Sequence, residues 1–255
     1  MKIIFSLFLC LLLTCYFPLS NAQLKPLVFA TDATYPPFET YDPSSTSIVG
    51  YDIDIANALC QQMLIKCKFI HVSFNEIFKG LNQGKYDAII SAVSITPARQ
   101  KLYDFTAPYY IATGSFVALT SSNLDLTAPK LANSHIGVLG GTAFEAYLKA
   151  KYNNLLNIHP YQHIEEALAD LSSQKINIVL GDTPVITNWI ANQNPGEYKI
   201  IGVAAPDKNI FGTGVGIVVR KNNKELLNAL NNALATIKKN GNYNKITQEY
   251  FGPED

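Results

Sequence analysis

The chain has 255 residues, of which 48% are hydrophobic and 16% charged, so its composition is globular and excludes a largely disordered chain. Lysine plus arginine equals aspartate plus glutamate at 20 each, which gives no electrostatic reason to expect nucleic acid or an anionic membrane surface as a partner. At this length the chain can form one large domain or two modest ones, each with its own core.

The first 22 residues predict a secretory signal peptide. Lys2 precedes an apolar stretch over residues 3–17, and Ser20 and Ala22 are the small residues expected before a cleavage site. We therefore expect cleavage after Ala22 and export to the periplasm. A membrane anchor would need about 20 apolar residues. A lipoprotein would use Cys15, whose preceding threonine is larger than the residue such a site prefers.

Cys60 and Cys67 are the two cysteines of the mature chain. An even, closely spaced pair in an oxidising compartment predicts a disulfide. The alternatives are two buried free thiols or a zinc site, which would need two ligands where the sequence nearby offers only His71.

Short apolar strands alternate with amphipathic helices along the mature chain, which predicts an α/β fold. The expected strands cover residues 27–31, 68–72, 87–91, 135–139, 176–180 and 214–220. The expected helices cover residues 51–64, 75–81, 143–151, 164–172, 224–239 and 243–251, with others starting at Thr96-Pro97 and Asp182. No segment resembles a flexible linker, so we expect the chain to pass between two domains through strands.

Motifs of hydrolases, zinc proteases and nucleotide-binding proteins are missing from the sequence. His159 and His163 stand four residues apart, but Pro160 argues against one shared helix and therefore against a metal site. We expect no cofactor, no metal and no catalysis.

The segment from Ser91 to Arg99 runs from the end of an expected strand into the start of a helix. It presents hydroxyls, free backbone N–H groups and a guanidinium together, which suits a carboxylate. Arg99 and Arg220 are the only arginines among 20 basic residues, which indicates that the planar two-pronged guanidinium matters where it occurs. The alternative is a surface salt bridge at a helix start.

Two further turns follow expected strands. Val138 to Ala143 places a glycine pair before a helix N-terminus, where a ligand can approach backbone donors. Thr31 to Phe38 places an acid and two aromatic residues on a loop stiffened by prolines. The alternatives are an ordinary strand–helix turn and a packed loop whose aromatic residues belong to the core.

Together these segments resemble the periplasmic binding proteins for polar amino acids of ABC transporters, particularly the lysine/arginine/ornithine- and histidine-binding proteins. The resemblance covers nearly all of residues 24–251. Its most specific pieces are Asp32–Phe38, Gly50–Asp54, the Cys60/Cys67 pair, Ser91–Arg99, Val138–Thr142, Gly181-Asp182 and Gly214–Gly216. The resemblance implies the two-lobed, type II α/β fold with a ligand cleft between the lobes. Lobe 1 would comprise residues 23–111 and 213–255, lobe 2 residues 112–212, and two hinge strands would cross near 111–113 and 211–213.

The same resemblance implies roles for ten cleft residues. Arg99 would grip the α-carboxylate of an amino acid as a bidentate pair, helped by Thr142 and by the backbone N–H groups of Ser94 and Ala143. Asp182, from the second lobe, would accept hydrogen bonds from the α-ammonium group, with Ser94 assisting.

The ligand side chain would lie between Tyr35 and Phe74, with Asp32 and Ser91 at its polar end and the Ala92 carbonyl near the ammonium group. An aromatic sandwich closed by an acid favours a flat guanidinium. Arginine is therefore the first expected ligand, followed by lysine, ornithine or histidine. Hinge closure and transfer to a membrane permease would follow, and we expect a monomer.

Three observations keep alternatives open. Glutamine-binding relatives also carry an aspartate at the Asp32 position, so a glutamine or other polar amino-acid ligand is possible on these residues. Phe144 replaces a glutamine that the basic-ligand relatives show. A periplasmic cyclohexadienyl dehydratase also resembles this fold and would need a general acid, for which Glu145 is the candidate by sequence.

Overall fold

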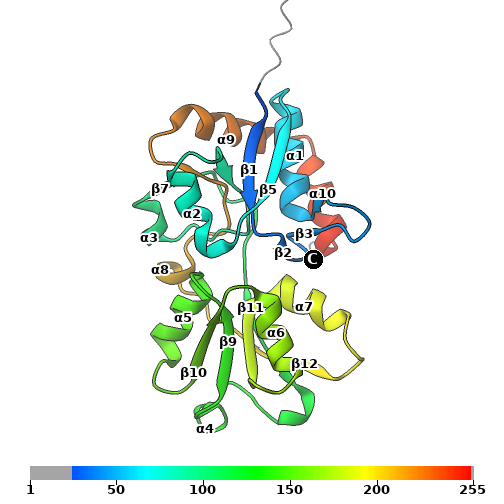
Figure 1. The fold of residues 1–255 in the computed structure, drawn as a ribbon, viewed down its shortest axis with the longest axis vertical. Helices are drawn as coiled ribbons and strands as arrows, with labels where there is room; N and C mark the ends of the chain where they lie inside the picture. Colours follow the sequence, from blue (N-terminus) through cyan, green and yellow to red (C-terminus); the bar gives the residue numbers. More distant parts are fainter. Residues whose placement is uncertain (1–24, 254–255) are drawn as a thin grey trace, which may run out of the picture.

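Two five-stranded sheets, one in each lobe, form the framework of the protein (Figure 1). The computed structural model describes residues 25–253. The predicted signal peptide and its cleavage site lie outside these residues. Among the helices of residues 25–253, none has the length and apolar character needed to cross a membrane.

The sheet of the first lobe contains residues from both ends of the described chain. Its strand order is β5 (Cys67–His71), β1 (Leu27–Thr31), β6 (Ala88–Ile89), β13 (Val218–Arg220) and β7 (Tyr103–Phe105). Strand β1 is parallel to β5 and β6, whereas β13 is antiparallel to both of its neighbours. The helices of this lobe are α1 (Tyr51–Gln62), α2 (Phe74–Asn82), α3 (Pro97–Gln100), α9 (Lys224–Lys239) and α10 (Asn242–Phe251).

The second lobe repeats this plan with residues from the middle of the chain. Its strand order is β10 (Asn157–Tyr161), β9 (His135–Leu139), β11 (Ile178–Asp182), β8 (Gly114–Leu119) and β12 (Tyr198–Val203). Strand β9 is parallel to β10 and β11, whereas β8 is antiparallel to both neighbours. Its helices are η1 (Thr120–Ser122), α4 (Ala128–Leu131), α5 (Ala143–Tyr152), α6 (Ile164–Ser172), α7 (Thr183–Ala191) and α8 (Lys208–Phe211).

The chain crosses between the lobes twice. It leaves the first sheet after Phe105 and enters the second at Gly114, and it returns between α8 and β13. The two crossings run side by side, because the Val215 N–H donates to the Tyr110 carbonyl and the Tyr109 N–H donates to the Val215 carbonyl. The lobe boundaries expected from the sequence fall within these crossings, and the position of the hinge itself stays a prediction.

A small sheet that the sequence did not predict lies beside the first lobe's sheet. It consists of β2 (Thr34–Tyr35), β3 (Glu39–Tyr41) and β4 (Ile48–Val49), paired antiparallel. Gly50 ends it with φ 134°, and a Cβ there would collide with the Phe38 carbonyl. Only glycine can therefore pass this close before α1 begins.

Several strands are shorter or shifted relative to the expected ranges. Strand β6 ends after Ile89, since the chain turns away at Ala92, which has a positive φ of 46°. Strand β11 starts at Ile178 rather than 176, because Lys175 and Ile176 close the turn after α6 by bonding to the Asp170 carbonyl. Strand β13 is confined to 218–220, since the preceding glycines belong to the crossing.

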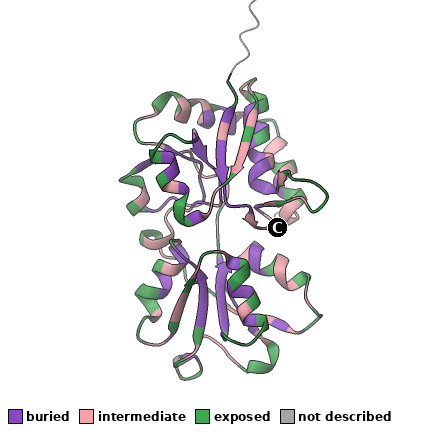
Figure 2. Ribbon diagram, in the orientation of Figure 1, coloured by how far each residue is buried: buried purple, intermediate pink, exposed green. Residues whose placement is uncertain are grey.

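Buried residues concentrate in the central strands of both sheets and on the helix faces packed against them (Figure 2). Two helix starts near the junction have side-chain caps, and the one at Thr96 was predicted from the sequence. The Thr96 hydroxyl accepts a hydrogen bond from the Arg99 N–H, and the Thr142 hydroxyl accepts one from the Glu145 N–H. These caps fix the beginnings of α3 and α5 beside the cleft.

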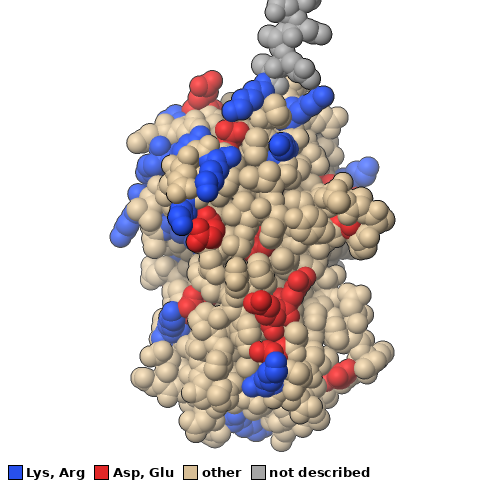
Figure 3. Space-filling model, in the orientation of Figure 1, with Lys and Arg blue, Asp and Glu red and all other residues tan. Residues whose placement is uncertain are grey.

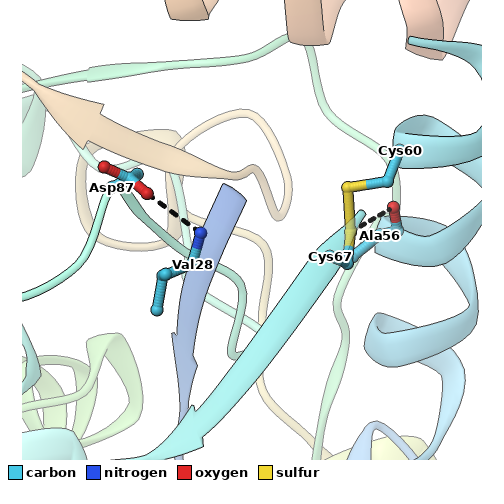
Figure 4. The surroundings of a disulfide bond; sticks show 5 residues. All are labelled: Val28, Ala56, Cys60, Cys67 and Asp87. Carbon is cyan, nitrogen blue, oxygen red and sulfur yellow. Dashed lines mark hydrogen bonds between the residues drawn. A yellow bond between two sulfur atoms is a disulfide. The ribbon is translucent and has the colours of Figure 1, made fainter. Parts of the chain in front are cut away.

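Cys60 and Cys67 form a disulfide that joins α1 to β5, which confirms the predicted bond (Figure 4). The bond closes a short loop, with a sequence separation of 7. It fixes the C-terminal part of α1 against an edge strand of the first sheet, far along the chain from the crossings.

Replacing both cysteines by alanine should reduce the free energy of unfolding by about 2–3 kcal/mol, because the unfolded chain regains loop entropy. For a chain of this size the melting temperature should fall by about 4–12 °C. Scanning calorimetry of the double variant and of the wild type with and without reductant measures this. Equal melting temperatures in all three samples would contradict a stabilising role.

Candidate functional site

A cavity lies between the two lobes. It brings together all ten residues to which the family resemblance assigned a role in the cleft. Three residues that were not assigned a ligand-binding role also line it. The lining residues are Asp32, Tyr35, Glu39, Phe74, Ser91, Ala92, Ser94, Arg99, Leu139, Thr142, Ala143, Phe144 and Asp182. Their individual roles toward a ligand stay predictions.

The first wall is built where parallel strands β1 and β6 end. Asp32 follows β1 and Ser91 follows β6, so both side chains reach the same edge of the sheet. The Asp32 N–H donates to Ser91 Oγ at 3.0 Å. The Asp32 carboxylate accepts hydrogen bonds from the Phe74 N–H and the Thr34 hydroxyl, both at 2.9 Å. Asp32 is thus buried but fixed in place.

Ala92 turns the chain at this wall with its positive φ. Its N–H donates to Asp52 Oδ2 at 2.8 Å, and the Tyr109 hydroxyl donates to the same oxygen at 2.8 Å. Asp52 is fully buried in the first turn of α1. A buried carboxylate therefore stabilises the backbone conformation that exposes Ser91 and Ala92 to the cavity.

Arg99 on α3 is the one cationic side chain among the lining residues. Its guanidinium lies 5.4 and 5.2 Å from the ring centres of Phe74 and Phe78. It donates to two carbonyls, Ser94 at 3.1 Å and Gly141 at 3.0 Å, and forms no ion pair with any described carboxylate. Desolvation lowers the pKa of Arg99 to about 10, so it remains charged at neutral pH. A desolvated guanidinium without a carboxylate partner is suited to an anionic group of a ligand.

Asp182 closes the cavity from the second lobe, at the end of β11. The Tyr35 hydroxyl donates to Asp182 Oδ2 at 2.7 Å across the junction of the lobes. Its other oxygen, Oδ1, is buried and receives no hydrogen bond from any described donor. Burial raises the pKa of Asp182 to about 7. An unpaired buried carboxylate oxygen can accept a hydrogen bond from a ligand donor.

The remaining second-lobe wall is the start of α5. Thr142 Oγ1 donates to the Leu139 carbonyl at 2.7 Å, and Ala143 begins the helix, whose N-terminus carries partial positive charge. Phe144 packs its ring against Gly114 and Phe211 while also lining the cavity. Phe144 therefore gives this part of the cavity wall an apolar surface.

Glu39 is the lining residue that sequence reasoning missed. It lies on β3, is fully buried, and accepts a hydrogen bond from Ser91 Oγ at 2.8 Å. Burial and the neighbouring Asp52 raise its pKa well above the usual range. The only sequence signal was its place directly after Phe38, the last residue of the loop that had been singled out.

Two histidine rings lie at the edge of the acidic end. The Nδ1 atoms of His71 and His163 are 3.8 and 3.7 Å from Asp32 Oδ1. His163 belongs to the second lobe, and acidic side chains also gather on that lobe beside the junction on the face in Figure 3. Within the described residues, no group of three or more histidine, cysteine or acidic side chains could hold a metal ion.

The cavity therefore has two chemically different ends. One carries an unpaired guanidinium and a helix N-terminus, and the other carries buried carboxyl groups. Residues 27–253 match the bacterial extracellular solute-binding proteins, family 3. The chain belongs to this family. The assignment confirms the predicted resemblance and the solute-binding function.

Known proteins similar to this family 3 solute-binding protein have amino acids as ligands. It is 39% identical over 235 residues to the ABC transporter arginine-binding protein 1 of Escherichia coli strain K12, covering 92% of this chain and 94% of that one. A Salmonella typhimurium periplasmic binding protein, studied for its high arginine specificity, has a TM-score of 0.83. It is 34% identical, and the match covers 89% of this chain and 99% of that chain.

One solved neighbour bears on the enzyme alternative. It is an ancestral amino-acid-binding protein described as a precursor of cyclohexadienyl dehydratase. Its TM-score is 0.78 at 27% identity, covering 89% of this chain and 95% of that one. Glu145, the acid considered for such chemistry, does not line the cavity, because it accepts from the Gly141 N–H and pairs with Lys149.

Stability of the ligand-free solute-binding protein should fall as the pH rises from 5 to 8. A carboxyl group whose pKa is higher in the folded than in the unfolded state binds more protons when the protein is folded. Its contribution to the free energy of unfolding is therefore lost as the pH rises between the two pKa values. For Asp182 this window runs from about pH 4 to about pH 7. The expected loss from Asp182 alone is about 2–3 kcal/mol. Urea unfolding at both pH values measures it.

Asp182→Asn should make this fall shallower, because asparagine does not ionise. Asp125→Asn is the matched control, since the pKa of Asp125 is lowered and its titration is complete below pH 5. A wild-type protein that is more stable at pH 8 than at pH 5 would contradict the raised pKa of Asp182.

Proposed function

We propose that this chain is the periplasmic receptor of an ABC import system for a cationic L-amino acid, with arginine as the first candidate. The observation that carries the proposal is the charge distribution in the cavity. One guanidinium, Arg99, faces three lining carboxyl groups, Asp32, Glu39 and Asp182. An amino acid with a cationic side chain has one carboxylate and two cations, which complements this arrangement.

The carboxylate of the ligand would bind Arg99. Two donors of the guanidinium are used by the Ser94 and Gly141 carbonyls, and its fork offers further N–H groups. Thr142 and the N–H groups of Ser94 and Ala143 would complete the carboxylate site. The unpaired Oδ1 of Asp182 would accept a hydrogen bond from the α-ammonium group, assisted by Ser94 and the Ala92 carbonyl.

The ligand side chain would then extend between Tyr35 and Phe74 toward Asp32 and Ser91. A guanidinium stacked on aromatic rings gains about 1–2 kcal/mol when it is desolvated. Glu39 extends the acidic end beyond the residues predicted from sequence, which favours a cation over the neutral amide of glutamine. The names of the arginine-binding relatives agree with this choice.

Ligand binding would close the two lobes about the crossings. Asp32 and Arg99 belong to one lobe, and Thr142 and Asp182 to the other, so only the closed arrangement completes the site. The closed, monomeric receptor would then dock on a membrane permease. The chain would be exported to the periplasm by its signal peptide, which would be cleaved after Ala22.

Catalysis on this fold is the second candidate function. The buried carboxyl groups of Glu39 and Asp182 have raised pKa values, as a general acid requires, and one solved neighbour is a precursor of a dehydratase. Incubation of the purified chain with prephenate tests it. Turnover would place the enzyme first, and its absence would exclude this chemistry.

L-Arginine at about a thousand times its Kd should add about 4 kcal/mol to stability and raise the melting temperature by about 8–16 °C. The mature chain should first be unfolded and refolded to remove carried-over ligand. Thermal scans against single amino acids then rank the ligands. A rise with glutamine but not with arginine would contradict a cationic ligand, and no rise with any amino acid would contradict the function.

Arg99→Lys should weaken arginine binding by about 10–100-fold, because lysine keeps the charge but loses the two-pronged contact. Arg220→Lys is the matched control. Arg220 donates to the backbone carbonyls of Leu81 and Tyr86 and does not line the cavity. The Arg220→Lys protein should therefore bind arginine with the affinity of the wild type. Equal affinities for both variants would remove Arg99 from the proposed site.

A further inference from the structure

Two buried carboxyl groups lie against each other beneath the acidic end of the cavity. Glu39 and Asp52 are both 0% exposed, and they lie close together because the adjacent residues Ser91 and Ala92 donate hydrogen bonds to Glu39 and Asp52 respectively. Glu39 lines the cavity, whereas Asp52 lies behind it on α1. Two carboxylates in contact and away from solvent repel each other strongly, so the pair cannot readily carry two negative charges.

The surrounding donors leave one vacant oxygen on each carboxyl group. Ser91 Oγ donates to Glu39 Oε1, while the Ala92 N–H and the Tyr109 hydroxyl donate to Asp52 Oδ2. Glu39 Oε2 and Asp52 Oδ1 are buried and receive no hydrogen bond from any other described group. One proton held between these two oxygens would satisfy both.

The groups that face the pair supply no compensating positive charge. The neighbouring titratable side chains are Asp32, Asp182, Tyr35, Tyr51 and Tyr109, and each is neutral or acidic. No described lysine, arginine or histidine forms an ion pair with Glu39 or Asp52. Burial raises the pKa of Asp52 to about 6 and that of Glu39 well above its usual range. Two buried carboxyl groups this close together therefore favour a state in which the pair holds one proton.

We propose that a cation entering the acidic end of the cavity displaces the proton shared by Glu39 and Asp52. This inference rests on the proposed function and specifies its regulation. The cation would stand next to Glu39 on the cavity wall and stabilise its ionised form. The O–H bond of the shared proton breaks, the proton passes to solvent, and the electron pair stays on the carboxylate. Receptor binding is thereby linked to pH.

Linkage gives the sign and size of the effect. A ligand whose binding releases one proton binds up to about tenfold more tightly for each unit of rising pH. The receptor would accordingly bind arginine more tightly at pH 8 than at pH 7. The α-ammonium site contributes a second release through Asp182, whose pKa of about 7 leaves only about a tenth of it protonated at pH 8. At pH 8, release therefore reports mainly on the carboxyl pair.

Titration calorimetry of the mature protein with L-arginine at pH 8 tests the inference. The same titration in Tris and in phosphate gives the number of protons released, because the two buffers differ in protonation enthalpy. We expect about 0.5–1 proton for the wild type. Binding with equal enthalpy in both buffers would overturn this inference while leaving the proposed function in place. No binding heat in either buffer, with no rise in melting temperature, would overturn both.

The Glu39→Gln variant tests whether the proton released on arginine binding comes from the Glu39–Asp52 pair. Glutamine can donate its amide hydrogen to Asp52 and so keep the contact, but it has no proton to release. The release should fall to about 0.1 proton, which is the share expected from Asp182. Glu225→Gln, on the exposed side of α9, is the control and should release as much as the wild type. Unchanged release by a folded Glu39→Gln protein would overturn the assignment.

Discussion

The desolvation of charged groups between the lobes is the constraint on which the rest of the structure depends. Asp32, Glu39 and Asp182 are buried and Arg99 is half-buried, and these groups form no ion pairs with one another. Such groups destabilise the fold unless backbone donors, aromatic rings or a ligand compensate them. The turn at Ala92, the capped start of α3 and the rings of Phe74 and Phe78 all serve this compensation. The site is therefore held in place by the protein's own turns, helix caps and aromatic rings, some of which also line the cavity.

Contacts across the junction show how the empty site satisfies these groups. The Tyr35 hydroxyl bonds to Asp182, and Arg99 bonds to the Gly141 carbonyl, each joining one lobe to the other. Both bonds occupy groups that the proposed ligand would need. The protein's own hydrogen bonds thus stabilise part of the closed arrangement without a ligand. The binding free energy of a ligand is the difference between the contacts that it makes and the cross-lobe bonds that it replaces. Specificity then depends on groups left unsatisfied, such as Asp182 Oδ1 and the acidic end.

Sequence reasoning located the cleft because its loops combine unusual residues at strand ends. The scarce Arg99, the glycine turn before Ala143 and the proline-rich loop after β1 are each visible locally. Glu39 escaped, since its burial depends on Ser91 and Asp52, which are distant in sequence or on another element. The small sheet escaped for a similar reason, because its strands have two or three residues and show no periodicity. Pairing and burial that come only from tertiary contacts leave no local pattern.

The paired crossings determine what kind of motion the lobes can make. The Val215 N–H donates to the Tyr110 carbonyl and the Val215 carbonyl accepts from the Tyr109 N–H, so the two connections form a narrow two-stranded ribbon. A ribbon bends easily across its flat face but resists bending in its own plane and sliding of one edge along the other. The lobes would consequently rotate relative to each other about a single hinge axis. A partner that reads the position of the second lobe would need to sense only that single coordinate.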